Sequence, residues 1–133
     1  MNKQGANNNP RIIVIQKLYS YFLNKETSIN YPKHRYKKFI KDTVSGTIER
    51  EEFLLENLKV ILKDEFSPSR TDLILKLMIL SATFELMFSH KTPINVIVSE
   101  YVKISDFFLE TAHKGYLNAI LDKVSKKVRK EGE

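Results

Sequence analysis

Apolar residues recur at helical spacing along the last third of the chain, from Pro93 to Lys130. The first series lies on one face of a helix and comprises Ile94, Ile97, Val98, Tyr101, Val102, Ser105, Phe108 and Leu109. After a polar stretch at residues 110–115, the second series comprises Tyr116, Leu117, Ile120, Leu121, Val124 and Val128. This pattern predicts two amphipathic helices joined by a tight turn at Gly115, with apolar faces that cover each other or a shared third surface.

The N-terminal part of the chain begins with a polar segment and then shows a helix start. Residues 1–9 are rich in asparagine, and we expect them to form a disordered tail. Asn9 followed by Pro10 is typical of an N-cap and a proline at the first helical position. The predicted buried face of this helix comprises Ile12, Ile15, Tyr19, Phe22 and Leu23. The same spacing leaves Arg11 and Lys17 nearer to solvent.

The middle of the chain is also predicted to be helical. Apolar residues at helical intervals run from Pro32 to Asp64, either as one long helix or as two helices joined near Gly46. Ser67–Pro68 and Thr92–Pro93 repeat the cap-then-proline pattern, so each is expected to start a helix. The helix after Ser67–Pro68 is apolar on several faces, which predicts a central position in the fold.

These elements predict an all-α protein with about six or seven helices. No segment has the alternating pattern of a strand bounded by turn residues. A chain of 133 residues has the length of one domain with its own core. We therefore expect a single compact domain, residues 10–130, in which a half built on residues 10–66 packs against a half built on residues 67–130.

Charge is unevenly distributed along the chain. The net charge is +6, yet residues 43–111 hold seven basic and eleven acidic side chains. Residues 1–42 hold nine basic and two acidic side chains, and residues 112–133 hold six and three. Basic ends of this kind suit the binding of a polyanion, whereas the alternative is that the lysines only keep a helical protein in solution.

Catalytic and metal-binding patterns are missing from the sequence. The three histidines, His34, His90 and His113, are far apart, and the chain has no cysteine, so no metal site is expected. Only four glycines are present, which excludes a glycine-rich phosphate loop. The longest apolar stretch, residues 77–88, is too short to span a membrane, and the polar N-terminus is not typical of a signal peptide. We expect a binding protein, not an enzyme, and no cofactor.

Three sequence motifs resemble the NusB transcription-antitermination family. Residues 11–21, RIIVIQKLYSY, are similar to the first helix of that family, and residues 84–86, Phe-Glu-Leu, are similar to its Tyr-Glu-Leu motif. Pro93, residues 98–102 and residues 116–122, YLNAILD, are similar to its C-terminal half. The motifs occur in the family's order and cover most of the chain. The resemblance also favours one continuous helix over residues 32–64, in which Gly46 permits close packing.

The resemblance implies a function in RNA binding. Members of the family hold boxA-type single-stranded RNA together with NusE, a small-subunit ribosomal protein, within the transcription elongation complex, so that polymerase reads through terminators in ribosomal-RNA operons. The resemblance also implies a cytoplasmic protein, and whether the chain forms a homodimer is left open. Cations for phosphates and planar side chains for bases are needed, and the candidates are Arg11, Lys17, Tyr19, His113, Lys114 and Tyr116. Tyr19 has a competing interpretation as a core residue, whereas Tyr116 should be more open after the Gly115 turn.

This chain departs from the family pattern at several positions. The arginine-rich run that often precedes the first helix is replaced by residues 5–10, GANNNP, and Leu80, Ser99 and Tyr101 replace the usual arginine, asparagine and alanine. The basic residues at 33–41 or at 126–130 are candidates to substitute for the missing phosphate contacts. Two alternatives stay open: a helical protein-interaction module that has lost RNA binding, and a relative of the NusB-like domain fused to some RNA methyltransferases.

Overall fold

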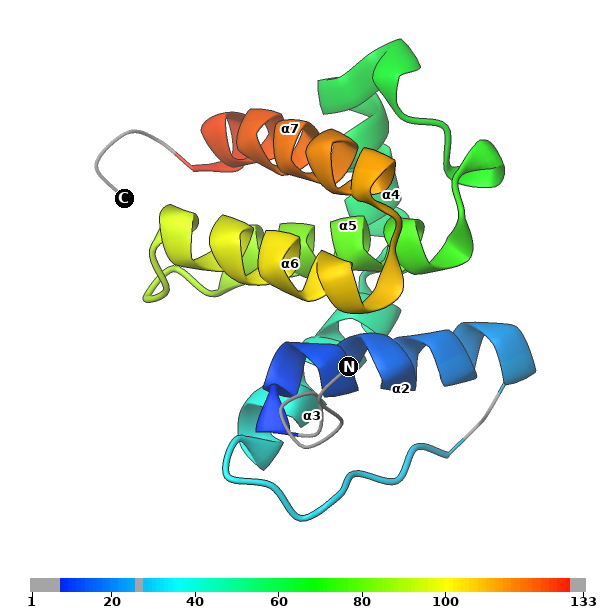
Figure 1. Ribbon diagram of the computed structural model, residues 1–133, viewed down its shortest axis with the longest axis vertical. Helices are drawn as coiled ribbons and strands as arrows, with labels where there is room; N and C mark the ends of the chain where they lie inside the picture. Colours follow the sequence, from blue (N-terminus) through cyan, green and yellow to red (C-terminus); the bar gives the residue numbers. More distant parts are fainter. Residues whose placement is uncertain (1–7, 26–27, 130–133) are drawn as a thin grey trace.

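The computed structural model describes residues 8–25 and 28–129. Within these residues the chain forms six α-helices and two short 3₁₀ segments (Figure 1). The α-helices are α2 (Pro10–Asn24), α3 (Lys37–Glu49), α4 (Glu51–Leu62), α5 (Leu73–Phe88), α6 (Ile94–Phe108) and α7 (Thr111–Val128), and the 3₁₀ segments are η1 (Lys63–Glu65) and η2 (Pro68–Arg70). No strand occurs in this part of the chain, so the all-α prediction is confirmed.

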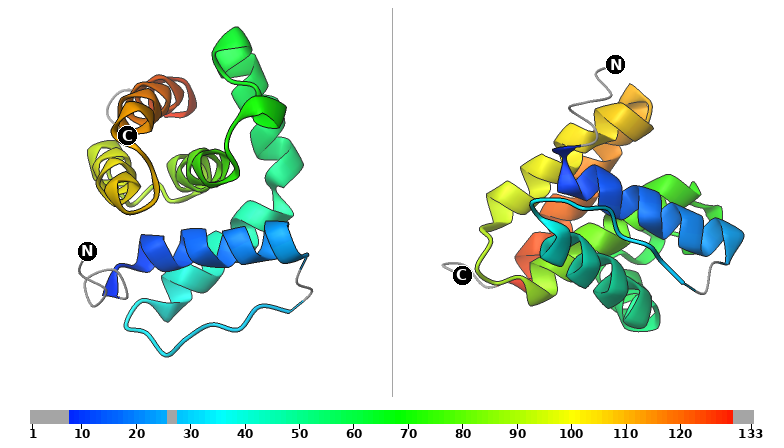
Figure 2. Two further views of the ribbon diagram at one scale, coloured as in Figure 1. Left: turned by 45° about the vertical axis from the view of Figure 1, so that its right-hand side comes forward. Right: turned by 90° about the horizontal axis from the view of Figure 1, so that it is seen from below.

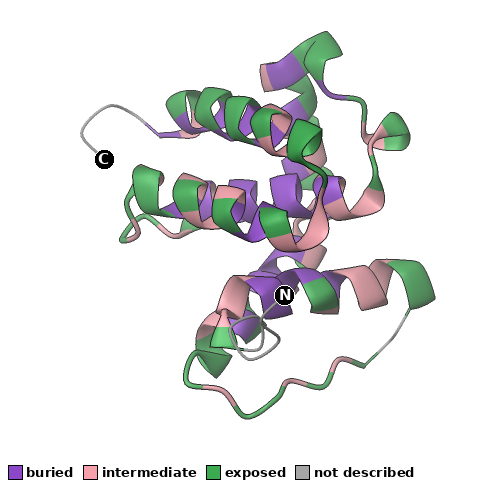
Figure 3. Ribbon diagram, in the orientation of Figure 1, coloured by how far each residue is buried: buried purple, intermediate pink, exposed green. Residues whose placement is uncertain are grey.

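Helix α2 starts where the sequence predicts. Asn9 is the N-cap, its side-chain oxygen accepts a hydrogen bond from the Arg11 backbone nitrogen at 3.0 Å, and Pro10 takes the first helical position. Two details of its predicted faces are wrong. Leu23 is 54% exposed instead of buried, because the last turn of α2 extends beyond the helices that cover the rest of it (Figure 3). The Arg11 side chain is only 12% exposed, because it turns towards a buried carboxylate.

Of the two alternatives for residues 32–64, the structure has two helices and not the one continuous helix that the family resemblance favours. Helix α3 begins at Lys37, not at Pro32. The helical conformation is interrupted at Arg50, between α3 and α4, where φ is −109° and ψ is 17°. Backbone hydrogen bonding continues across the interruption, since the Arg50 nitrogen bonds to the Gly46 oxygen at 3.1 Å. The change of direction follows from packing, because α3 contacts α2 and α5 whereas α4 contacts α5 and α7.

Helix α5 lies at the centre of the fold, as its apolar sequence predicts, but it starts later than expected. Ser67–Pro68 leads only into η2, and the helix is capped by Asp72, whose carboxylate accepts from the Leu75 nitrogen at 3.3 Å. Eleven of its sixteen residues are buried. The left view of Figure 2 shows α5, α6 and α7 nearly end on as a group of three helices, with α2 lying across them.

The turn between α6 and α7 comes earlier than predicted. The chain turns at Leu109 and Glu110, which are both extended, and Gly115 lies inside α7. A glycine in a helix interior costs about 1 kcal/mol relative to alanine. The packing of α7 against α4, α5 and α6 offsets this local cost, so the tertiary contacts determine where the helix begins.

One hydrophobic core joins all six α-helices (Figure 3). Its buried members include Leu18 of α2, Val44 of α3, Leu58 of α4, Ile97 of α6 and Leu121 of α7, together with most of α5. Helices from both predicted halves, residues 10–66 and 67–130, contribute to this single core. The division at residue 66 stays a prediction.

Replacing Gly46 with alanine is expected to lower the free energy of unfolding by about 1–3 kcal/mol, although alanine is the better helix former. A Cβ atom at this position would lie 2.2 Å from Cζ and 2.4 Å from Cε1 of the Phe84 ring. Gly115→Ala is the matched control, because no atom lies within 4 Å of the added Cβ, and we expect it to stabilise the protein by roughly 1 kcal/mol. Urea denaturation followed by circular dichroism measures both, and equal changes in the two variants would contradict close packing at Gly46.

Candidate nucleic-acid interface

The six residues predicted to contact RNA lie on two helices. Arg11, Lys17 and Tyr19 are on α2, and His113, Lys114 and Tyr116 are on the first two turns of α7. Helix α2 packs against α6, which leads through a two-residue turn into α7. No hydrogen bond or ion pair between described residues joins one group directly to the other. The two groups therefore belong to neighbouring elements without forming one cluster of contacting side chains.

Arg11 forms a bidentate ion pair with the buried carboxylate of Glu85. Its Nε and Nη2 atoms donate to Oε2 and Oε1 of Glu85 at 3.0 and 2.6 Å, and the Glu85 side chain is fully buried. Planar, bidentate pairs of this kind are among the strongest side-chain hydrogen bonds. Burial lowers the pKa of Arg11, but the hydrogen bond and the charge of Glu85 outweigh it, so the net pKa is raised.

Two hydroxyl groups complete the network around Glu85. The Tyr101 hydroxyl donates to Oε2 of Glu85, so the Ser81 hydroxyl, 2.6 Å away, must donate to Tyr101 in turn. Burial and the nearby Glu85 charge raise the pKa of Tyr101 well above its usual range, which keeps its proton available for this bond. The network connects α2, α5 and α6. Glu85 lies in the middle of the apolar helix α5, and this position was the signal in the sequence that its carboxylate needs a buried partner.

Arg11 is therefore not free on the surface, contrary to the solvent-facing position expected from spacing. Its guanidinium carbon lies 4.8 Å from the centre of the Phe39 ring, and one edge faces a hollow at the start of α2. Arg11 holds α2 in place and presents only part of its cationic group to a ligand.

The remaining candidates differ in how available they are. Lys17 is half-buried, and Tyr19 is half-buried and packed against the core, in agreement with its alternative interpretation as a core residue. His113 is exposed. Lys114 lies 3.0 Å from both carboxylate oxygens of Asp106, on a surface where a competing phosphate can reach it.

Tyr116 is less open than expected. It lies inside α7, not after a turn, and its hydroxyl donates to the backbone oxygen of Glu65 in η1 at 2.7 Å. Burial and then the Glu65 charge raise the pKa of Tyr116. One role of Tyr116 is thus to hold η1 against α7, and its ring is half-buried.

The hollow at the start of α2 is a feature that spacing along single helices does not reveal. It has a volume of about 520 Å³ and brings together Arg11 of α2, Tyr36 and Phe39 near the start of α3, and Glu100 and Lys103 of α6. Cationic, acidic and aromatic groups from three elements thus meet in one concave site. A concave site in which a few polar groups stand beside aromatic ones is typical of ligand pockets. The signals in the sequence were the basic run at residues 33–41 and its aromatic residues, without any indication of what they would face.

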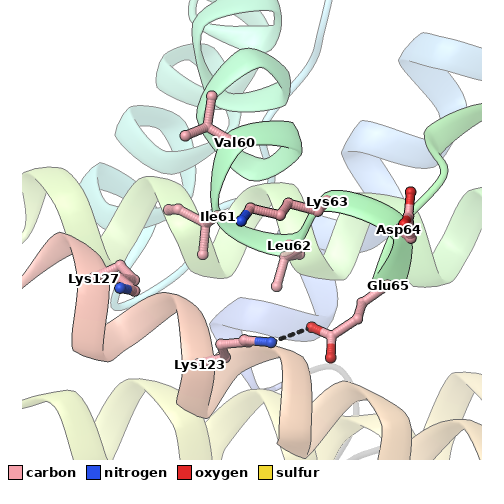
Figure 4. A pocket seen from close by; sticks show the side chains of 8 residues that line it. All are labelled: Val60, Ile61, Leu62, Lys63, Asp64, Glu65, Lys123 and Lys127. Carbon is pink, nitrogen blue, oxygen red and sulfur yellow. Dashed lines mark hydrogen bonds and ion pairs between the residues drawn. The ribbon is translucent and has the colours of Figure 1, made fainter.

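A second surface lies on the other side of the core, over α4, α5 and α7. Phe53, Val60 and Phe88 are large apolar side chains that are exposed there, and the Arg50 guanidinium carbon lies 4.7 Å from the centre of the Phe88 ring. A neighbouring hollow of about 590 Å³ lies between the end of α4 and α7. Figure 4 shows its lining side chains and the ion pair of Lys123 with Glu65. Exposed apolar side chains beside polar ones are typical of protein contact surfaces.

Residues 8–25 and 28–129 contain neither a metal-binding cluster nor a membrane-spanning helix. No group of three or more histidine, aspartate or glutamate side chains is placed to hold a metal ion there. No helix in those ranges has the length and hydropathy needed to cross a bilayer.

Comparison with known proteins agrees with the fold and the motifs. The NusB family profile matches residues 8–126. The transcription antitermination protein NusB of Mesorhizobium japonicum is 29% identical over 98% of this chain and 94% of its own length. The protein of the same name from Sinorhizobium fredii is 32% identical over 70% of this chain and 58% of its own length. Among solved structures, T. maritima NusB superposes with a TM-score of 0.80 at 21% identity, covering 93% of this chain and 94% of that one.

Proposed function

The chain belongs to the NusB family, and from this we propose that it is a transcription antitermination factor that binds boxA-type single-stranded RNA together with NusE. In this role it promotes read-through in ribosomal-RNA operons as a cytoplasmic part of the transcription elongation complex. It acts by binding and carries out no chemical reaction. The observation that carries the proposal is the match of the family profile over residues 8–126, supported by relatives named as antitermination proteins over nearly their full length.

The charge distribution supports RNA as the ligand. The two ends of the chain hold the excess of basic side chains, and single-stranded RNA is held by cations on phosphates and by planar groups on bases. We propose that Lys17, Tyr19, His113, Lys114 and Tyr116 contact the RNA. Arg11 contributes mainly by fixing α2 against Glu85.

NusE, in this proposal, increases RNA affinity because the protein alone has few free cations on α2 and on the first turns of α7. Lys114 must give up or share its contact with Asp106 when it binds a phosphate. A partner that supplies further phosphate contacts raises the affinity without any change in this chain.

The test is a fluorescence-anisotropy titration of a boxA-type RNA and a scrambled RNA, with and without NusE, at two salt concentrations. We expect binding that tightens with NusE and discriminates against the scrambled RNA. Lys17→Gln with Lys114→Gln should weaken binding and make the salt dependence shallower by about 0.7 in log–log slope for each lost phosphate contact. Lys59→Gln with Lys91→Gln removes the same charge from exposed positions elsewhere and is the control. Absence of RNA binding with and without NusE would contradict the proposal.

A second candidate function is a protein-interaction module that has lost RNA binding. The observation that favours it is the exposed apolar surface formed by Phe53, Val60 and Phe88. If this is the main function, a pull-down retains a protein partner but no RNA, and light scattering shows whether the chain associates with itself. Phe53→Ser with Val60→Ser should abolish that retention, whereas a partner that binds this variant normally would rule out the surface.

A further inference from the structure

The connection into α3 and the first turns of α3 together present a basic surface. Five cationic side chains are exposed on it, namely Lys33, Arg35, Lys37, Lys38 and Lys41. Lys38 pairs with Asp42 at 2.6 Å, and no other ion pair of this group occurs among the described residues. Figure 3 shows the start of α3 largely in the colour of exposed residues. These five residues, called the α3 basic surface below, carry an excess of positive charge that suits a polyanion.

Planar side chains stand among these cations. The Tyr36 side chain is 47% exposed, its ring lies 5.9 Å from the ring of His34, and the Arg35 guanidinium carbon lies 5.5 Å from the Tyr36 ring centre. His34 is held in place because its Nδ1 atom accepts from the Tyr36 backbone nitrogen at 2.9 Å. A row of lysines that only keeps a helix in solution does not need an exposed aromatic ring. Cations next to aromatic rings are the combination that binds single-stranded nucleic acid.

Tyr36 also borders the hollow of about 520 Å³ at the start of α2. Phe39 and the edge of Arg11 line its wall, while Glu100 and Lys103 contribute an acceptor and a cation from α6. A carboxylate can accept a hydrogen bond from the amino group of a base, and a lysine can bind the neighbouring phosphate. The hollow therefore offers both the polar and the planar contacts that one unstacked base requires.

We propose that the α3 basic surface and this hollow form a second contact site for single-stranded RNA. One base enters the hollow against Tyr36, and the phosphates on either side bind the cations of the α3 basic surface and Lys103. The start of α2 at Pro10 is about 10 Å from Lys17 along the helix axis. The sequence before α2 lacks the arginine-rich run of the family and has Lys3 as its only charged side chain. The proposed site supplies phosphate contacts in place of that run. It rests on the proposed RNA-binding function and extends it.

The test compares three variants of the full chain for binding to the same boxA-type RNA, with NusE present, over a series of salt concentrations. Lys33→Gln with Arg35→Gln and Lys37→Gln should raise the Kd about tenfold or more and make the log–log salt dependence shallower by about 2. Tyr36→Ala should raise the Kd at least about fivefold with little change in that slope, because it removes stacking and not charge. Lys59→Gln with Lys63→Gln and Arg70→Gln, at exposed positions away from the hollow, is the control, and it should keep the Kd within about twofold. Thermal unfolding verifies that all variants fold.

Four results would overturn the site, and they differ in what they leave standing. If the wild-type chain binds RNA but the α3 variants keep its Kd and salt dependence, the second site is wrong and the proposed function stands. If the control variant weakens binding as much as the α3 variant, the effect is one of net charge alone. If a parallel anisotropy titration with labelled polyglutamate shows that the α3 variants lose binding to this peptide but not to RNA, the surface is one for acidic peptides. If the wild-type chain binds no RNA, the proposed function fails and the site fails with it.

Discussion

Replacing Glu85 with alanine is expected to lower the free energy of unfolding by about 3–5 kcal/mol, the usual cost of removing one partner of a buried ion pair. The carboxylate is fully buried and accepts both nitrogens of Arg11 and the hydroxyl of Tyr101. Without it, a largely buried guanidinium and a fully buried hydroxyl lose their acceptor. Urea denaturation followed by circular dichroism measures the loss as a lower midpoint.

The pair itself is tested by a double-mutant cycle. Arg11→Met with Glu85→Met removes both charges, so we expect it to cost far less than the sum of the two single changes. Glu56→Ala, on an exposed part of α4, is the control for loss of a glutamate and should leave the midpoint unchanged. A Glu85→Ala variant as stable as the wild-type chain would show that Glu85 is not the anchor of α2.

Replacing Arg129 with alanine is expected to lower the free energy of unfolding by about 3 kcal/mol. This side chain, 2% exposed, follows the last residue of α7 and donates to four backbone oxygens at and beyond the end of α5. Its acceptors are Leu86 at 2.7 Å, Ser89 at 2.7 Å, Glu85 at 3.3 Å and Thr92. A cation at the C-terminal end of a helix is also favoured by the helix dipole. Thermal and urea unfolding should both show the loss.

Two variants separate the geometry of Arg129 from its charge. Arg129→Lys keeps the charge but donates from a single nitrogen, so we expect it to recover only part of the stability. Lys127→Ala removes a neighbouring cation that is exposed on α7 and should have little effect. Full stability in Arg129→Lys would mean that charge, and not the set of four hydrogen bonds, is what matters at this position.

The candidate RNA site was predicted from the sequence only in part, because some of its contacts join residues that are far apart in the chain. The sequence identified Lys17, His113 and Lys114 as candidate RNA contacts. Lys17 lies on α2 as predicted, whereas His113 and Lys114, expected in the turn before the last helix, lie inside α7. The sequence did not predict that Arg11 pairs with a residue 74 positions away, or that Tyr116 bonds to a residue 51 positions away. The hollow beside Tyr36 was also missed, because its walls come from three separate elements.

The sequence by itself determined the helical class, the start of α2 at Asn9–Pro10, the central position of α5 and the family. These properties depend on periodicity, capping and motif order, which act within a few residues of one another. Only the tertiary structure decided the interruption at Arg50, the turn at Leu109–Glu110 and the partners of the buried arginines. Each of these depends on which helices pack together, and the energy of burying an apolar face or pairing a buried charge outweighs the small local preference of one residue.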